Sequence, residues 1–183
     1  MAALCHGAST PKAEILWDKY GVPHIYAKES GSMAYAFGYA QMQSHGNLVL
    51  QLYGKSRGRG AEYFGASFVE LDEWVRMNNV PAIAARWLTE QKPQFREMLE
   101  QFAAGMNQYA KDHPDKIDAA NKAVLPVVPT DPLAHTLRII HLSFVAKTGD
   151  RGAPAVARGW NPTPASSPVP SAAANDDFAQ AEA

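Results

Sequence analysis

Apolar and polar residues alternate near the start of the chain, in residues 14–17, and strand-forming side chains return in residues 22–26. The segment between them, residues 18–21, has the sequence Asp-Lys-Tyr-Gly, which is typical of a tight turn. Pro23 restricts the second strand to a sheet edge or a bulge, because proline has no backbone N–H to donate. This pattern predicts a β-hairpin over residues 14–27.

After the hairpin, apolar residues recur every three or four positions, which is the spacing of one helix face. The first such pattern begins at Ser32, the expected N-cap, and runs until glycines at 54, 58 and 60 are expected to break it, followed by a glycine-punctuated loop at residues 57–65. The fold class is therefore predicted to be α+β, a mostly helical chain with an N-terminal β-hairpin. Further helices are predicted for residues 68–75, downstream of Pro81, from Pro93 to His113, and from Thr130 to Phe144.

The chain divides into three parts by composition. Residues 1–12 are interpreted as a leader, and residues 13–150 carry the strand and helix patterns. Residues 151–183 are rich in Pro, Ala and Ser and are expected to form an extended tail or the start of a spacer. Two strands in isolation are marginal in water, so the hairpin predicts a larger sheet that another polypeptide completes.

Composition and charge exclude several classes of partner. The chain has 183 residues, of which 46% are hydrophobic, and this is ordinary for a packed globular protein. Its net charge of −1 provides no basic surface for nucleic acid or for anionic membranes, so neither is an expected partner. No apolar run approaches the roughly 20 residues of a membrane-spanning helix, and the leader lacks the apolar core of a signal peptide.

The residues themselves provide no complete catalytic site, so no catalytic residue is predicted within this chain. Ser32 and Thr130 are expected at helix starts and Ser44 within a helix, none of them beside a base. Cys5 has no Cys/His partner, and the six histidines form no metal-binding motif, so no metal site is predicted.

Two further features have competing interpretations. His24 is a conceivable base, but a hydrogen-bonded structural histidine on a strand is the preferred interpretation. Lys55, Arg57 and Arg59 are a candidate anion site, but the preferred interpretation is that they are exposed residues that complement the dipole of the preceding helix.

Three ordered blocks point to a known family. They are Trp17–Ala27, which contains Tyr-Gly-Val-Pro-His-Ile, followed by Phe37–Gln43 and Arg57–Gly65. Together they resemble the N-terminal α-chain of penicillin acylase family N-terminal-nucleophile hydrolases, over roughly residues 13–147. Within that family the blocks are most similar to the acyl-homoserine lactone and aculeacin-type (lipopeptide) acylases.

The resemblance implies half of an enzyme. In this family an exported precursor cuts itself, and the first residue of a separate β-chain, a serine, becomes the nucleophile that its own α-amine activates. The resemblance therefore implies a periplasmic or secreted α-subunit of an αββα fold completed by the β-chain. Its expected substrates are N-acyl-homoserine lactones, with β-lactam side chains as a second class.

The resemblance also implies a site within this chain. In the family the end of the last α-chain helix forms one wall of the acyl pocket. The corresponding substrate-binding residues here are Ile140, His141, Leu142, Phe144 and Val145. Their alternative role is to pack the helix onto the β-chain. Penicillin G acylases have arginine and phenylalanine near the positions of Val145 and Ala146, and the smaller residues here favour a roomier apolar slot.

No cofactor is expected. The structural calcium of penicillin G acylases is held in part by a glutamate after this helix, where residues 147–154 offer only Asp150. The competing hypothesis from another functional class is a non-catalytic helical module that binds a protein partner through the hairpin and the apolar helix faces.

Overall fold

The computed structural model describes residues 12–145 and confirms a mostly helical α+β chain with one N-terminal hairpin. Strands β1 (Ala13–Trp17) and β2 (Pro23–Ala27) pair antiparallel, with Ile15 opposite Ile25. The carboxylate of Asp18 closes the turn, because Oδ1 accepts the backbone N–H groups of Tyr20 at 2.8 Å and Val22 at 2.9 Å. The leader and the Pro-rich tail fall outside the described residues, apart from Lys12.

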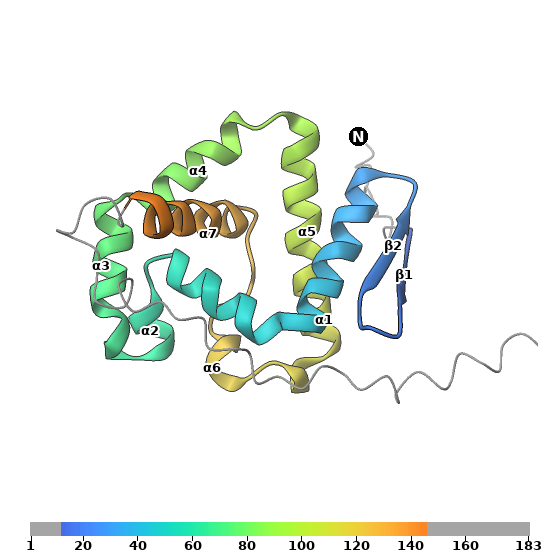
Figure 1. The fold of residues 1–183 in the computed structure, drawn as a ribbon, viewed down its shortest axis with the longest axis horizontal. Helices are drawn as coiled ribbons and strands as arrows, with labels where there is room; N and C mark the ends of the chain where they lie inside the picture. Colours follow the sequence, from blue (N-terminus) through green and yellow to red (C-terminus); the bar gives the residue numbers. More distant parts are fainter. Residues whose placement is uncertain (1–11, 146–183) are drawn as a thin grey trace, which may run out of the picture.

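Helices α1 (Ser30–Ser56) and α5 (Pro93–Asp112) form the centre of the fold and pack side by side (Figure 1). A Cβ atom on Gly38 would lie 2.1 Å from the carbonyl oxygen of Phe102, and one on Gly105 would lie 2.0 Å from that of Tyr35. The two backbones therefore touch directly at this crossing. Gly38 belongs to the second sequence block, and its small size serves helix packing.

The helix boundaries correct three details of the sequence prediction. Helix α1 begins at Ser30 with Glu29 as its N-cap, so Ser32 lies inside the helix and is not its cap. Helix α1 also continues through Gly54 and bends at His45, whose φ of −140° is not helical. The expected loop at residues 57–65 contains a short helix, α2 (Gly60–Phe64).

The remaining helices are α3 (Val69–Met77), α4 (Val80–Glu90), α6 (Ala119–Lys122) and α7 (Thr130–Ile140). In the view of Figure 1, helices α1, α3, α4 and α5 surround α7. As predicted, α4 and α5 carry a proline in the first turn, where the missing N–H costs nothing. Short 3₁₀ turns precede α3 and follow α5, and a π-helical turn, His141–Val145, extends α7.

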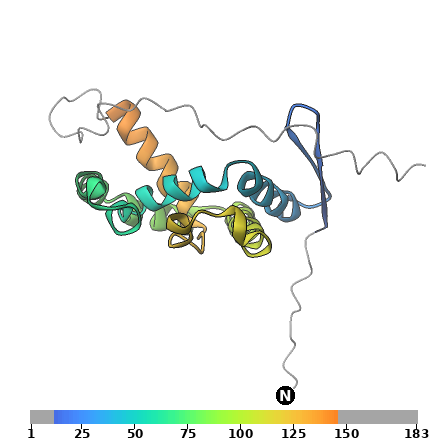
Figure 2. The same ribbon diagram turned by 90° about the horizontal axis from the view of Figure 1, so that it is seen from below.

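Two apolar clusters form the interior. The first joins α1 and α5 to the connector around α6, with Leu50 and Met106 fully buried. The second joins α3, α4 and α7, with Val75 and Ala84 fully buried. Figure 2 shows the helices as a layer from which the hairpin, at one end, and the C-terminal end of α7, at the other, rise on the same side.

Candidate functional site

A buried ion pair fixes the start of α7 to the end of α1. Arg57 donates from Nε and Nη2 to the two carboxylate oxygens of Asp131, at 2.7 and 2.6 Å. Its guanidinium also donates to the carbonyl oxygens of Val124 at 2.7 Å and Pro126 at 2.9 Å. Asp131 is 1% exposed. Burial alone would lower the pKa of Arg57, but the hydrogen bonds and charge of Asp131 outweigh it and raise this pKa.

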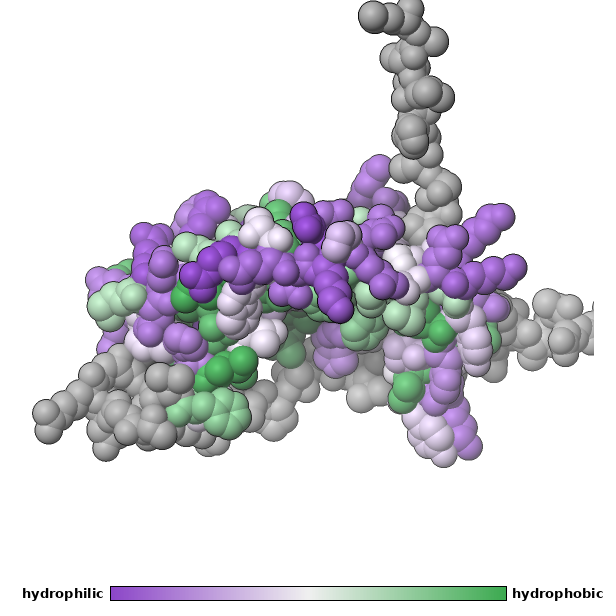
Figure 3. All heavy atoms as spheres, turned by 90° about the horizontal axis from the view of Figure 1, so that it is seen from above, coloured by the Kyte–Doolittle hydropathy of each residue, from purple (hydrophilic) through white to green (hydrophobic). Residues whose placement is uncertain are grey.

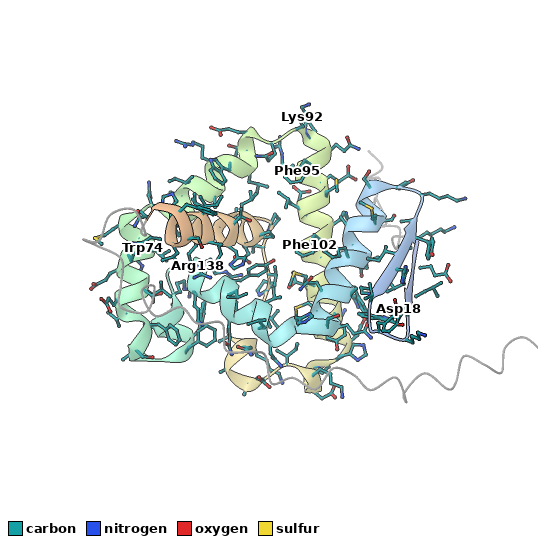
Figure 4. All side chains as sticks on the ribbon, in the orientation of Figure 1. Asp18, Trp74, Lys92, Phe95, Phe102 and Arg138 are labelled. Atoms are coloured by element: carbon teal, nitrogen blue, oxygen red, sulfur yellow. The ribbon has the colours of Figure 1, made fainter. Side chains whose placement is uncertain are left out.

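In its last turn, α7 carries a buried arginine, Arg138. Arg138 is 1% exposed and points toward α1 (Figure 4), where its Nε donates to Oγ of Ser56 at 2.9 Å. Its Nη2 lies 3.4 Å from Nδ1 of His135. Burial lowers the pKa of Arg138 to about 10. Burial and the nearby charge of Arg138 also lower the pKa of Lys55. We call Arg138, Lys55, His135 and Ser56 the Arg138 cluster.

Of the five predicted substrate-binding residues, Ile140 ends α7 and the other four lie on the π-helical turn that follows. The His141 ring meets Trp74 edge to face at 6.3 Å between centroids, and its buried Nδ1 makes no hydrogen bond among the described residues. Leu142 packs against the second apolar cluster. Ile140 and Phe144 are 41% and 69% exposed. Of these residues, Ile140 and Phe144 are therefore the pair that presents apolar surface.

An apolar groove of about 440 Å³ lies between the hairpin, α1, α5 and the start of α7. Three of the large apolar side chains that line it are exposed to solvent: Phe37 at 50%, Met33 at 43% and Phe95 at 42%. Figure 3 shows apolar patches toward the hairpin and toward the end of α7, whereas the outer faces of α4 and α5 are largely polar. The groove is lined by Pro23, Ile25, Met33, Ala34, Phe37, Phe95, Met98, Leu99, Phe102 and Pro132.

Comparison with known proteins decides the family. Residues 12–164 match the family described as penicillin amidase. The chain belongs to the penicillin amidase family. The match covers all of residues 12–145 that the structure describes, and it confirms the resemblance found in the three sequence blocks.

Relatives in the penicillin amidase family include enzymes with different named substrates. The chain is 29% identical over 118 residues to penicillin G acylase of Escherichia coli, covering 64% of this chain and 14% of that protein. It is 27% identical over 140 residues to acyl-homoserine lactone acylase PvdQ of Pseudomonas savastanoi pv. phaseolicola, covering 70% of this chain and 18% of that protein. The chain thus spans less than a fifth of the length of either relative.

The fold of this penicillin amidase family member also matches a solved structure. Thermostable penicillin G acylase from Alcaligenes faecalis aligns with a TM-score of 0.64 and 23% sequence identity. The alignment covers 73% of this chain and 74% of that chain. This similarity shows that the helices and hairpin have the arrangement found in penicillin G acylase.

The structure separates the predicted wall from the groove. Pro132, at the start of α7, lines the groove, whereas Ile140 to Val145 lie at the other end of the helix, about 12 Å or more along its axis. The predicted residues thus do not line the groove. The side chain of Val145 falls outside the described residues, and the assignment of all five to an acyl pocket stays a prediction.

Candidate catalytic and metal-binding residues remain scattered. Ser44 lies inside α1, Thr130 begins α7, and Cys5 falls outside the described residues. His24 is a hydrogen-bonded residue of the hairpin as predicted, with Nε2 3.3 Å from Oδ2 of Asp18. Within residues 12–145 no three His, Cys, Asp or Glu side chains are placed to hold a metal ion, and Asp150 lies beyond them. No helix in this part of the chain has the length and apolarity needed to span a membrane.

Sequence interpretation missed the structural roles of Arg57 and Arg138 in this penicillin amidase family chain. Arg57 is not an exposed residue beside a helix dipole, since its side chain is 17% exposed and bound to Asp131. Asp131 and Arg138 are seven residues apart, which is two helical turns, and lie on the buried face with Ala134 and Leu137. Charged residues in phase with an apolar helix face are the signal that could have revealed them.

We expect His135 to make stability sensitive to acid. Burial, then the charge of Arg138, lowers the pKa of His135 from 6.5 to about 4. As pH falls from 6.5 to 4, the unfolded chain binds a proton that the folded chain does not, so the folded state loses about 2 kcal/mol. His135→Gln retains an acceptor for Arg138 and is expected to remove this loss. Urea unfolding at pH 7 and pH 4.5 measures it, and equal pH dependence in both proteins would contradict the assignment.

Proposed function

We propose that this chain is the α-subunit of a heterodimeric acylase that hydrolyses the amide bond of N-acyl compounds. The observation that carries the proposal is the match of residues 12–164 to the penicillin amidase family. The nucleophile is the N-terminal serine of a separate β-chain, exposed by self-cleavage of a common precursor, with its own α-amine as the base. This chain contributes scaffold and pocket wall.

The exposed apolar surface supports a partner chain. A two-stranded hairpin is rarely stable alone, and the groove beside it leaves Phe37 and Phe95 about half exposed. Contiguous apolar surface of this kind marks an interaction site. The β-chain would extend the hairpin into a larger sheet and cover this surface.

The substrate class follows from the relatives. Their names include acyl-homoserine lactone acylases and penicillin G acylase, so the proposed substrates are N-acyl-homoserine lactones and, second, β-lactams with an acyl side chain. The proposed location is the periplasm or the outside of the cell, and no cofactor or structural calcium is assigned.

Intact-mass and N-terminal analysis of the protein produced from the complete gene tests the arrangement. The expected result is two chains, the larger of which begins with serine. The purified protein should release homoserine lactone from a long-chain N-acyl-homoserine lactone, and replacing that first serine by alanine should abolish release. A gene that stops after Ala183 would favour the non-catalytic protein-binding module instead.

Phe144 provides a test of the predicted acyl wall. Phe144→Ala removes a large apolar side chain and should change the ratio of kcat/KM values for long and short acyl substrates by about tenfold, since a pocket discriminates by about 1–3 kcal/mol per methylene. Met77→Ala is the control, because Met77 is 76% exposed and lies at the end of α3. An equal ratio in the wild type and in Phe144→Ala would remove Phe144 from the wall.

A further inference from the structure

The Arg138 cluster brings positive charge into the interior without a matching carboxylate. The guanidinium of Arg138 is 1% exposed, and within residues 12–145 its partners are a hydroxyl, that of Ser56, and the imidazole of His135. Its Nη1 makes no hydrogen bond in this part of the chain. The low pKa of His135 keeps the imidazole neutral at pH 7, so it supplies no negative charge.

A second cation adds to the imbalance. Lys55 lies near enough to Arg138 for the two charges to repel, and its ammonium is 4.8 Å from the centroid of the Phe68 ring. Unlike Arg138, the Lys55 side chain is only half-buried, which gives the cluster its contact with solvent. Two cations from α1 and α7 therefore converge beside one neutral histidine.

The other two charged residues that are buried as a whole in the described part of the chain, Asp131 and Asp72, are compensated. Asp131 is paired with Arg57 through two hydrogen bonds. Asp72, which is 7% exposed, accepts the backbone N–H groups of Gly60 at 2.7 Å and Ala61 at 2.8 Å. Since desolvating an unpaired charge is costly, folded proteins pair such groups or hydrogen-bond them fully. Arg138 departs from this rule.

The C-terminus of α1 compensates the cluster only in part. Lys55 and Ser56 occupy its last turn, where the helix dipole places a fractional negative charge. Half an elementary charge, shared between Lys55 and Arg138, is less than the two positive charges present. A full negative charge is therefore missing from the described structure.

We propose that an Asp or Glu side chain of the β-chain docks beside the half-buried Lys55 and supplies the negative charge that compensates Lys55 and Arg138. The inference rests on the proposed function, because it needs a second chain. Charge complementarity identifies the occupant as a carboxylate, and Lys55 is the member of the cluster that a side chain from outside can reach. The contact would lock α7 in place one turn before the predicted acyl wall.

The structure of the assembled two-chain enzyme tests the proposal directly. The expected result is a β-chain carboxylate oxygen within hydrogen-bond distance of the guanidinium of Arg138 or the ammonium of Lys55. Water, a free anion from the buffer, or a carboxylate from this chain in that place would overturn it. Absence of any second chain would instead overturn the proposed function, so the two failures are distinguishable.

Substitution provides an independent measurement. Arg138→Met should weaken association of the two chains, followed by their separation in urea, by about tenfold or more, and Arg138→Lys by less. Arg86→Met, on an exposed ion pair of α4, is the matched control and should change nothing. Replacing the contacting β-chain carboxylate by its amide should weaken association of the two chains when Arg138 is present. The same replacement should cause no further weakening in the Arg138→Met variant. Additive losses would show that Arg138 acts through packing and would overturn the proposal.

Discussion

Replacing Gly105 by alanine is expected to lower the free energy of unfolding by about 3 kcal/mol, at the upper end of overpacking costs. The new Cβ would lie 2.0 Å from the carbonyl oxygen of Tyr35, which is backbone and cannot rotate away. Gly38→Ala should be similarly destabilising, because its Cβ would lie 2.1 Å from the carbonyl oxygen of Phe102. Either change forces α1 and α5 apart, and these helices make the most extensive contact in the described fold.

Gly31→Ala is the matched control for both substitutions. Gly31 is in the first turn of α1, and a Cβ there would meet Gln101 and Glu97 side chains at an ordinary 3.5 Å. Alanine has the higher helix propensity, so this variant should be unchanged or more stable by up to about 1 kcal/mol. Urea unfolding of the three variants compares them. If Gly105→Ala matched Gly31→Ala, the helices would not cross as closely as the structure shows.

Local patterns predicted the elements of the fold because the relevant physics is local. The Asp18 to Gly21 turn formed as expected, since Asp18 bonds the backbone within four residues and Gly21 adopts φ 75°. Pro81 and Pro93 predicted the starts of two helices, because the preference for proline in the first helical turn is also local. The prediction that Ser32 is the N-cap of α1 was wrong, because any serine that precedes a helical pattern has the sequence signature of a cap. The observed N-cap is Glu29, which makes no side-chain capping hydrogen bond.

Long-range pairing limited what the sequence could reveal about the site. Arg57 and Asp131 are 74 residues apart, and nothing within either segment indicates that they meet. The position of Asp131 and Arg138 in the helical repeat of α7 places both on the buried face. It does not reveal that Asp131 has an oppositely charged partner within residues 12–145 whereas Arg138 has none there. The predicted wall came from family resemblance, and the structure adds that Ile140 and Phe144 are exposed on the surface of the described residues.

The second large effect is expected for Asp131→Asn, which should destabilise the protein by about 3 kcal/mol. The substitution keeps the shape of the side chain but removes the charge that compensates Arg57. Arg57 would then remain largely buried, with two carbonyl oxygens, those of Val124 and Pro126, as its acceptors. The backbone N–H of Val128, which donates to Oδ2 at 2.8 Å, would also face an altered acceptor. The end of α1 and the start of α7 should loosen together.

Glu62→Gln is the control that isolates burial as the cause of this effect. Arg59 and Glu62 form a two-bond ion pair of the same kind, but their side chains are 47% and 55% exposed. Because water solvates both partners when the pair is broken, the urea midpoint should not change measurably. A loss in Asp131→Asn no greater than in Glu62→Gln would mean that the Arg57–Asp131 pair is solvated in solution. In that case it could not be the contact that fixes α7 to α1.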